Sequence, residues 1–305
     1  MKVLVTGGCG YVGSVLVPKI KKAGYDVVSN DIGWFGGEPD DKSDFREAEN
    51  LEEFDAIIHL AGIANDPTGD LDPRLTWETN ALGTMQLADV AARSGVKQFI
   101  YASSGSVYGV SDVPAVTEDT RLNPISEYNK TKMVAERVLL SYKHQMAVQI
   151  VRPATVCGFS PRMRLDVAVN MLTMQALTKG AITVLGGNQM RPNIHIEDMT
   201  DLYLFMLEHR ELTGVYNAGF ENRSIMEIAK KIAKRTNAEI HVRESNDPRS
   251  YRIDSTKLME AGFKPKRTVK MAIAEMIEKY QKGELEDTDN CYNLRVMRFV
   301  TEDMQ

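Results

Sequence analysis

Cysteine is scarce in this chain of 305 residues. The three cysteines, Cys9, Cys157 and Cys291, are far apart and odd in number. Cysteines so few and so widely spaced indicate neither a disulfide framework nor a Cys-x-x-Cys metal site. The five histidines do not pair with one another or with cysteine at metal-ligand spacing. The sequence therefore predicts no bound metal, and a reducing cytoplasm suits it best.

The sequence also lacks long apolar runs and an excess of charge of one sign. No stretch approaches the length of a membrane-spanning helix, and Met1 and Lys2 lead at once into a short strand and glycines, unlike a signal peptide. Basic and acidic residues are interspersed, and the formal net charge is -5. No basic stripe is therefore present to neutralise a nucleic-acid backbone. We expect an intracellular protein that binds neither membranes nor nucleic acid.

Short apolar strands alternate with helices through the first half of the chain. The strands show no polar alternation, which is typical of a parallel sheet covered by helices on both faces. The predicted strands are Val3–Thr6, Asp26–Ser29, Ala56–Leu60, Gln98–Ala102 and Val148–Val151, and the predicted helices are Val12–Ala23, Leu75–Arg93 and Ser126–His144. Residues 33–50 are expected to form a surface loop. The predicted fold class is α/β, a doubly wound parallel sheet of the Rossmann type.

The pattern changes after Pro153 to isolated helices with a few short strands. The helices are predicted at Asp166–Thr178, Met199–Glu208, Ser224–Arg235 and Val269–Lys282, and strands at Ile182–Leu185 and Glu239–Val242. We predict a cofactor domain of residues 1–155, to which 190–215 return, and a smaller, mainly helical substrate lobe of 156–189 and 216–305. Ligands of open α/β sheets bind at the carboxyl edge, so the substrate is expected between the lobes. The tail from Glu284 has no predicted role.

A glycine-rich turn, Gly7–Gly13, joins the first predicted strand to the first helix. Such a turn lets a diphosphate approach the backbone at a helix N-terminus. Asp31 ends the next strand, where a carboxylate binds a ribose 2′-hydroxyl and repels a 2′-phosphate. The sequence therefore predicts NAD, and not NADP, as the cofactor. The residues of the turn expected to line it are Gly7, Gly10, Tyr11 and Val12.

Tyr128 and Lys132 lie four residues apart where a helix is predicted to begin, so the phenol and the ammonium share one face. A phenol with an ordinary pKa of ~10 is a poor base at neutral pH, but a nearby cation favours its anion. A proton-transfer site is therefore conceivable. The same spacing also arises by chance on solvated helices.

Together with the glycine turn and Asp31, three further segments resemble the extended short-chain dehydrogenase/reductase family, and more narrowly its nucleotide-sugar epimerase and dehydratase branch. These segments are His59–Gly62, Ser103–Gly109 and Tyr128–Lys132. The resemblance implies that Tyr128 is the acid/base, that Lys132 holds the nicotinamide ribose and lowers the pKa of the phenol, and that Ser104 binds the reacting hydroxyl. It also implies a homodimer and a supporting role for Asn80. The remaining cofactor contacts that it implies are Asp44 at the adenine and Leu60, Ala61 and Gly62 at the diphosphate.

The resemblance extends to a substrate of the nucleotide-diphosphate sugar class. Arg191 lies in a segment similar to one whose arginine meets the nucleotide diphosphate, a task that suits a bidentate, permanently charged group. Arg249 is expected to be a second phosphate ligand, although the family's commoner Arg-Pro-Gly-Asp run is missing upstream of it. Asn170 is assigned to the same nucleotide pocket. Arg162 and Arg164 fit either that pocket or a solvated surface.

The residues after Ser104 bear on the reaction. Related 4,6-dehydratases carry an Asp-Glu pair there, whereas this chain has Gly105 and Ser106, so dehydration is disfavoured. Cys157 is the one nearby candidate for an additional proton-transfer group, and a buried structural thiol is the favoured interpretation. What remains predicts epimerisation at C4 through a 4-keto sugar. A 4-dehydrogenase or 4-ketoreductase would use the same residues, a non-catalytic cofactor-sensing protein is a more distant alternative, and the nucleotide and sugar stay open.

Overall fold

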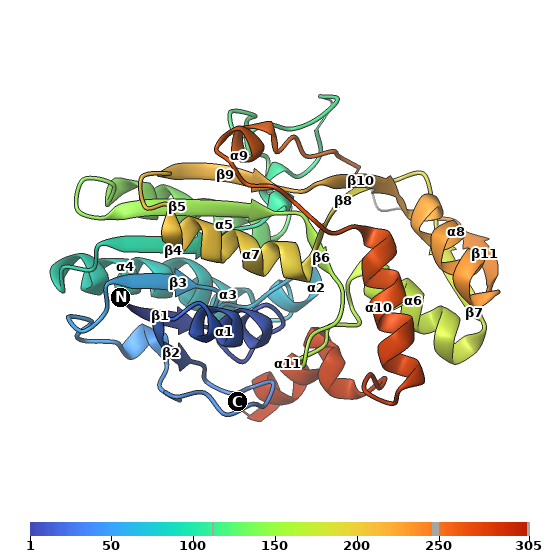
Figure 1. Cartoon of the computed structure of the whole chain (residues 1–305), viewed down its shortest axis with the longest axis horizontal. Helices are drawn as coiled ribbons and strands as arrows, with labels where there is room; N and C mark the ends of the chain where they lie inside the picture. The colour runs from blue at the N-terminus through green and yellow to red at the C-terminus, as the bar shows by residue number, and fades with distance from the viewer. Residues whose placement is uncertain (112, 246–249, 304–305) are drawn as a thin grey trace.

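The computed structural model describes residues 1–111, 113–245 and 250–303 (Figure 1). A six-stranded sheet with the order β2-β1-β3-β4-β5-β9 lies at its centre. Its strands are β1 (Lys2–Thr6), β2 (Asp26–Asn30), β3 (Ala56–His59), β4 (Gln98–Ala102), β5 (Ala147–Pro153) and β9 (Gly214–Ala218). All neighbours pair in parallel. The predicted doubly wound parallel fold is confirmed, and β9 adds a sixth strand from the second half of the chain.

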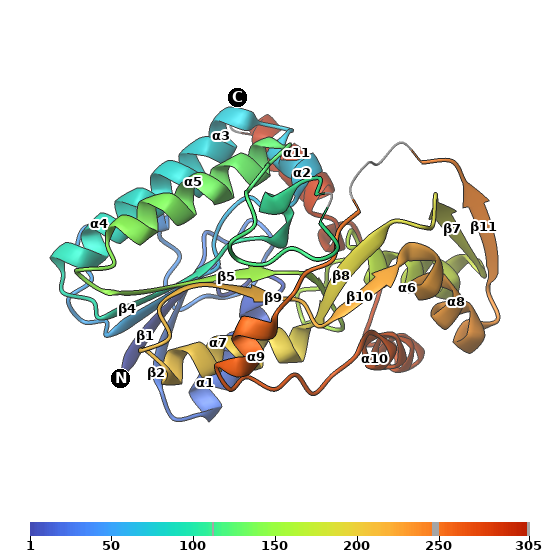
Figure 2. The same ribbon diagram turned by 90° about the horizontal axis from the view of Figure 1, so that it is seen from above.

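Helices cover both faces of this sheet, as Figure 2 shows from above. One face carries α1 (Gly13–Lys22), α7 (Ile196–Glu208) and α9 (Thr256–Glu260), and the other carries α3 (Pro73–Trp77), α4 (Thr84–Arg93) and α5 (Glu127–Ser141). Along β1 the side chains alternate between the two layers. Val3 and Val5 belong to the same core cluster as Leu16 of α1, whereas Leu4 belongs to the opposite cluster with Leu87 of α4. Both faces are buried, which explains why the strands read as continuous apolar runs.

The helix predicted at Leu75–Arg93 forms in three parts, because a π-helical turn, η2 (Glu78–Gly83), separates α3 from α4. Asn80 lies in this turn. Its side-chain amide accepts a hydrogen bond from Ile63 N at 2.8 Å and donates one to Ile63 O at 2.9 Å. The turn thereby fixes the loop after β3, which is the supporting role expected of Asn80.

A second group of elements packs at the carboxyl edge of the main sheet. The helices α6 (Ala168–Lys179), α8 (Ile225–Thr236) and α10 (Val269–Gln281) surround a parallel pair, β7 (Ala181–Leu185) and β11 (Glu239–Arg243). They enclose a core of their own, which includes Ile182, Ile228 and Ile273. A three-stranded sheet, β10-β8-β6, leads from this lobe to the main sheet, with bounds β6 (Thr155–Cys157), β8 (Met190–His195) and β10 (Glu221–Ser224).

The C-terminal tail returns from α10 to the first half of the molecule (Figures 1 and 2). It contains a short 3-10 turn, η4 (Asp289–Cys291), and α11 (Asn293–Asp303), which packs beside α2 (Asp66–Gly69). Asn290 donates to Phe35 O at 3.0 Å, and Met297 is buried with Ile63 and Leu75. The tail for which the sequence predicts no role therefore covers loops at the carboxyl edge of the sheet.

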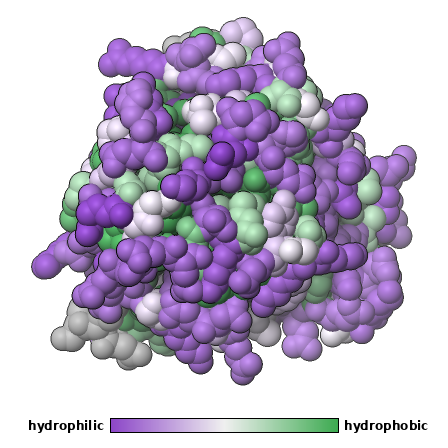
Figure 3. Space-filling view, turned by 60° about the vertical axis from the view of Figure 1, so that its left-hand side comes forward, coloured by the Kyte–Doolittle hydropathy of each residue, from purple (hydrophilic) through white to green (hydrophobic). Residues whose placement is uncertain are grey.

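The surface seen in Figure 3 is mostly hydrophilic, with small hydrophobic areas between polar side chains. This agrees with the interspersed charges of the sequence. Among the helices of residues 1–111, 113–245 and 250–303, none is long and apolar enough to cross a membrane.

Candidate active site

A cavity of ≈ 390 Å³ lies where β1, β3 and β4 end. The order of the sheet reverses between β1 and β3, and such a switch point is where open α/β sheets bind their ligands. The cavity brings together all the residues predicted for the cofactor and for catalysis. These are Gly7, Gly10, Tyr11, Val12, Asp31, Asp44, Leu60, Ala61, Gly62, Ser104, Tyr128 and Lys132.

The glycine turn is shaped for close backbone approach. Gly7 has a φ of +75°, and a Cβ on it would lie 2.7 Å from Ala61 N in the loop after β3. A Cβ on Gly13 would lie 2.2 Å from Gly7 O, so larger residues fit at neither position. Helix α1 begins at Gly13, and its first amides lie at the cavity. This bare, partly positive helix end fits the diphosphate of NAD.

Two carboxylates, Asp31 and Asp44, line the part of the cavity where the adenosine is predicted to bind. Asp31 accepts hydrogen bonds from Cys9 N at 3.0 Å and Gly33 N at 2.9 Å, which fix it beside the glycine turn. Asp44 forms a salt bridge with Arg46 at 2.6 Å. Burial alone raises the pKa of Asp44, but its hydrogen bonds with Arg46 outweigh this effect and hold the pKa below the usual range. The contact of Asp44 with adenine stays a prediction.

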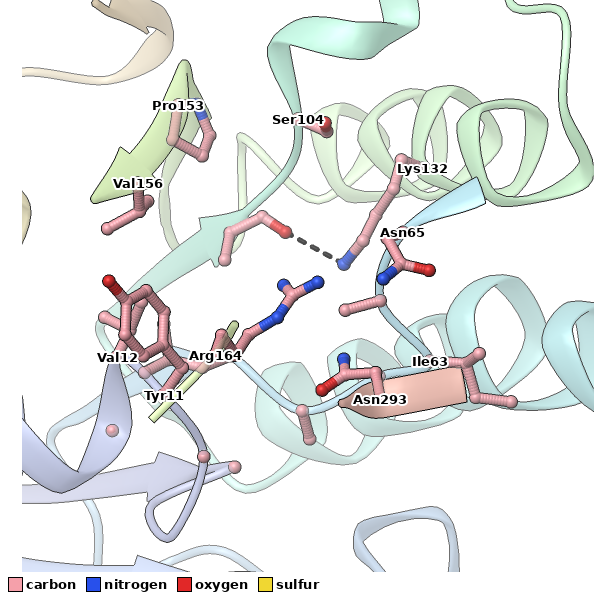
Figure 4. A pocket seen from close by; sticks show the side chains of 18 of the residues that line it. Tyr11, Val12, Ile63, Asn65, Ser104, Lys132, Pro153, Val156, Arg164 and Asn293 are labelled. Carbon is pink, nitrogen blue, oxygen red and sulfur yellow. Dashed lines mark hydrogen bonds between the residues drawn. The ribbon is translucent and has the colours of Figure 1, made fainter. Parts of the chain in front are cut away.

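Ser104, Tyr128 and Lys132 meet at the other end of the cavity. Ser104 follows β4 and caps a short 3-10 helix, η3 (Gly105–Tyr108); its hydroxyl shares a hydrogen bond of 2.6 Å with that of Ser106. Helix α5, which carries Tyr128 and Lys132, starts at a Ser126 cap. Lys132 Nζ donates to the carbonyl oxygen of Ala102, the last residue of β4, at 2.9 Å (dashed in Figure 4). The i, i+4 spacing thus places both side chains at the strand end where Ser104 lies.

Burial affects Lys132 strongly, because its side chain is only 5% exposed. Burial lowers the pKa of Lys132 to about 8, although the charge of Glu136 opposes this shift. Its Nζ lies 4.8 Å from the ring centre of Tyr101 and 6.0 Å from that of Tyr128. At neutral pH the ammonium stays largely charged.

The expected lowering of the Tyr128 pKa by Lys132 is not what the structure shows. Burial raises the pKa of this phenol, while the hydroxyl of Ser104 and the charge of Arg164 act in the opposite direction. Lys132 Nζ is directed at Ala102 O and lies over the Tyr101 ring. Desolvation therefore dominates at Tyr128, and the nearby cation that favours its anion is Arg164.

A buried polar chain supports α5 from behind. Glu136 accepts a hydrogen bond from Ser103 and forms an ion pair with Arg152 at 2.7 Å, in which both side chains are almost completely buried. Arg152 also donates to Tyr108 Oη at 2.8 Å, and Tyr108 donates to Asn217 at 2.7 Å. These contacts tie α5 to β4, β5 and β9.

Of the residues predicted for the nucleotide of the substrate, neither Asn170 nor Arg191 lines this cavity. Asn170, which was expected to line the nucleotide pocket, is completely buried; it accepts from Gly158 N at 3.0 Å and donates to Tyr11 Oη at 3.0 Å and Arg164 O at 2.9 Å. These bonds use its amide to hold two loops together. Arg191 lies on β8 and donates to Met190 O at 3.1 Å. Arg249 lies outside the described residues, so its role and that of Arg191 stay predictions.

Arg162 and Arg164, in contrast, line the cofactor cavity and are largely buried, which does not fit a solvated surface; their place in the pocket of the substrate nucleotide stays a prediction. Arg164 points between Tyr11 and Lys132 in Figure 4. The spacing of the two arginines was a signal in the sequence, because residues two apart in an extended segment point to the same side. Asn293, from the tail, also lines the cavity, and no pattern in the sequence predicted it.

Cys157 has the structural role expected of it, and His195 has a structural role as well. Cys157 is completely buried, which raises the pKa of its thiol far above the usual range. His195 accepts from Glu197 N at 3.1 Å and caps α7. Within the described part of the chain, no cluster of three or more histidine, cysteine, aspartate or glutamate residues is arranged to hold a metal ion.

Known proteins resemble this chain along almost its whole length. A UDP-glucose 4-epimerase of Lactobacillus helveticus is 30% identical over 310 residues, which covers 87% of this chain and 92% of the relative. UDP-glucuronic acid decarboxylase 1 of Danio rerio is 29% identical over 314 residues, which covers 95% of this chain and 74% of the relative. Among solved structures, MoeE5 in complex with UDP-glucose and NAD has a TM-score of 0.83 and 26% identity, and covers 93% of this chain and 99% of its own.

The family model with the description "NAD dependent epimerase/dehydratase family" matches residues 3–219, which include all of the main sheet except Lys2 at the start of β1. The glycine turn and the bare N-terminus of α1 fit the cofactor that this description names. The chain therefore belongs to the NAD-dependent epimerase/dehydratase family, and its cofactor is NAD.

Proposed function

We propose that this protein is a nucleotide-sugar 4-epimerase, which oxidises the C4 hydroxyl of its substrate to a ketone and reduces it again on the opposite face. The observation that carries the proposal is the meeting of Ser104, Tyr128 and Lys132 at the cofactor cavity. Gly105 and Ser106 follow Ser104 where a dehydratase needs a carboxylate pair. The site thus has one acid/base group, Tyr128, at the cofactor cavity.

Each residue of the site has a defined part in this reaction. Tyr128 takes the proton of the C4 hydroxyl and later returns it, a contribution of ~10²- to 10⁴-fold for a positioned acid/base. Bound NAD accepts a hydride from C4 and gives it back. Ser104 holds the reacting oxygen, with its own hydroxyl oriented by Ser106 at 2.6 Å. Lys132, with its pKa lowered to about 8 by burial, provides a charged donor for ribose hydroxyls at neutral pH.

The environment of Ser106 supports one acid/base and not two. Its hydroxyl bonds to Ser104 and to the side chain of Asn129, and neither partner exchanges protons readily near neutral pH. Asp66 is a carboxylate that lines the same cavity, and it accepts a hydrogen bond of 2.8 Å from Ser126, the cap of α5. Its place at the start of α5 suits a positioning role.

We further propose a UDP-sugar as the substrate, because the relatives and the solved structure named above bear UDP-sugar names. Arg191 and Arg249 are then the expected diphosphate ligands. A homodimer formed through α4 and α5 is part of the same proposal. It is supported by exposed apolar residues beside these helices, Leu82 (49%) and Met85 (39%).

A decarboxylase is the second candidate, favoured by the similarity to the Danio rerio enzyme. Oxidation at C4 by the same residues turns a sugar with a carboxylate on C5 into a β-keto acid, which loses carbon dioxide easily. A dehydrogenase would result if the 4-keto sugar left before its reduction, and a ketoreductase would run that oxidation in reverse. The epimerase, the decarboxylase and the dehydrogenase share the first step and differ in the product.

Incubation of the holoenzyme with UDP-glucose and no added cofactor distinguishes them. We expect the C4 epimer by NMR, with no net formation of NADH. Stoichiometric NADH with a keto sugar would replace the proposal by an oxidoreductase, and carbon dioxide from UDP-glucuronate without epimer would replace it by a decarboxylase.

Two further measurements test the acid/base and the nucleotide. Tyr128→Phe is expected to abolish turnover while the purified protein keeps its NAD. A thermal-shift series with UDP, GDP, CDP and dTDP is expected to favour UDP, and equal shifts would argue against the substrate class.

A further inference from the structure

The segment Ser160–Arg164, after β6, brings two guanidinium groups to the cofactor cavity, and the proposed reaction assigns no ligand to either of them. Arg162 is 9% exposed, and the side chain of Arg164 is 14% exposed. Both line the cavity together with the glycine turn. A buried arginine away from water needs either a protein acceptor or a ligand for its N–H groups.

The segment is attached directly to the N-terminal end of α1. Ser160 Oγ donates to Tyr11 O at 2.7 Å and lies 2.8 Å from Ser14 Oγ. Arg162 N donates to Ser14 Oγ at 3.4 Å, and the phenol of Tyr11 donates to Gly158 O at 2.7 Å. These contacts join residues about 150 positions apart. They place the two arginines at the cavity that the glycine turn also lines.

Each arginine keeps one buried nitrogen unused. Arg162 lies over the Phe35 ring at 4.0 Å and donates through Nη2 to Asn293 at 2.6 Å, but its Nε has no partner among the described residues. Arg164 donates through Nε to Asp166 at 2.9 Å, and its Nη2 likewise has no partner in that part of the chain. Both unused nitrogens are in side chains that border the cavity. An acceptor from a ligand would satisfy them.

The local charge points to an anion. Burial and the neighbouring Arg164 lower the pKa of Arg162 to about 10, so its guanidinium stays charged at neutral pH. The carboxylate beside them, Asp166, is already bonded to Arg164, to Asn65 and to the backbone of Asn293. Asp31, the other carboxylate that acts on Arg162, is bonded to Cys9 N and Gly33 N. A diphosphate supplies negative charge and the acceptor geometry that arginine matches.

We propose that Ser160–Arg164 is a second diphosphate-binding element, in which Arg162 and Arg164 bind the phosphates of NAD together with the glycine turn. The C-terminal tail supports this element, because Asn293 holds Arg162 and the carbonyl of Cys291 accepts from Leu165 N at 2.8 Å. The cofactor is thus enclosed between the sheet edge, the loop after β6 and the tail. The proposal rests on NAD binding and is independent of the reaction catalysed.

The test is the affinity of the stripped full-length protein for NAD and for ADP-ribose, measured by calorimetry. Arg162→Gln and Arg164→Gln are each expected to weaken binding of both ligands by about 10- to 100-fold, as for loss of a charge-assisted hydrogen bond. Adenosine, which lacks the diphosphate, is expected to bind all forms alike. Arg162→Lys keeps the positive charge but not the forked guanidinium, so its affinity for NAD should lie between those of the wild type and Arg162→Gln. Arg295→Gln removes an exposed charge from the same tail and should bind like the wild type.

A diphosphate also occurs in the nucleotide-sugar, and the same variants separate the two sources. If affinity for UDP-glucose fell in the NAD-loaded protein while affinity for NAD and ADP-ribose stayed unchanged, the arginines would belong to the substrate and the proposal would be wrong. The melting temperature of the stripped protein gives a further check. A purely structural arginine would lower it on replacement, whereas a ligand-binding one leaves it unchanged or raises it; a clear fall with unaltered NAD affinity would overturn the proposal.

Discussion

Two regions of the molecule bury arginine in opposite ways. At the end of β5, Arg152 has a carboxylate, a phenol and a backbone carbonyl for its N–H groups, and its ion pair with Glu136 is almost completely buried. In the loop after β6, Arg162 and Arg164 each keep a buried nitrogen without a partner among the described residues. The first arrangement is complete in the protein alone and holds α5 in place. The second becomes complete only with a ligand.

This difference teaches how to read a buried charge. Burial by itself does not distinguish a structural arginine from a binding one, because both are removed from water. The number of satisfied donors does distinguish them, since an unpaired buried group costs free energy that only a function compensates. Replacing each type should therefore affect different quantities, namely stability for Arg152 and ligand affinity for Arg162 and Arg164.

The largest effect is expected at Arg152. Arg152→Leu leaves the carboxylate of Glu136 buried and unpaired, so we expect a loss of about 3–5 kcal/mol in the free energy of unfolding, measured by urea denaturation. The double variant Arg152→Leu/Glu136→Leu removes both charges and should recover most of the loss. If Arg152→Leu were as stable as the wild type, Arg152 would not be a structural arginine and the contrast with Arg162 and Arg164 would fail.

Replacing Lys132 should change the free energy of unfolding in the opposite direction, towards greater stability. Its pKa is about 8 in the folded protein and near 10.5 when unfolded, so burial of the charged form destabilises the fold below pH 8. We expect Lys132→Met to stabilise the NAD-free protein at pH 7 by on the order of 2 kcal/mol, and to lose this gain between pH 8 and 10.5. Urea denaturation of the variant and the wild type at pH 7 and pH 10 measures this gain and its loss. If the variant were less stable than the wild type at pH 7, the hydrogen bond from Lys132 to Ala102 would outweigh the cost of burying the charge.

A smaller effect is expected from the tail. Met297 is buried beside Ile63 and Leu75, so Met297→Ala should cost about 2 kcal/mol in stability and increase the rate at which NAD leaves the protein. Val300, which packs at the edge of the same cluster, offers a milder replacement to alanine as the control. If Met297→Ala lowered stability but left the rate of NAD release unchanged, the tail would have no part in retaining the cofactor.

The smallest effect is expected for the stability of the NAD-free protein without Arg162. Arg162→Leu removes a charge with an unused donor, so the free energy of unfolding should change by no more than about 1 kcal/mol in either direction. The same change from arginine to leucine is predicted to lower the free energy of unfolding by about 3–5 kcal/mol at Arg152. A loss as large as that of Arg152→Leu would show that both regions are structural and would remove the contrast between them.

The sequence predicted those parts of the site that lie directly after a strand or on one helix face. Gly7, Asp31 and the Tyr128 and Lys132 pair have positions that are set by local geometry, and the structure places them all at one cavity. Contacts between distant residues could not be predicted in this way. Asn293 is 131 positions from Arg162, to which it bonds, and Asn170 is 159 positions from Tyr11.

The electrostatics of the site were also beyond the sequence. The spacing of Tyr128 and Lys132 correctly put both on one helix, but it says nothing about desolvation or about the direction of Nζ. Burial raises the pKa of the phenol, and the cation that opposes this effect comes from the loop after β6. Such values depend on packing around the group and not on its neighbours in the chain.

The most direct test of the central claim follows a deuterium label at C4 of the nucleotide-sugar through turnover by the NAD-loaded enzyme. If hydride leaves C4 and returns to the same carbon within one site, the epimer formed from UDP-glucose should keep its deuterium, and none should exchange with water. An epimer that has lost the label from C4 would contradict a transient 4-keto sugar with Tyr128 as the acid/base.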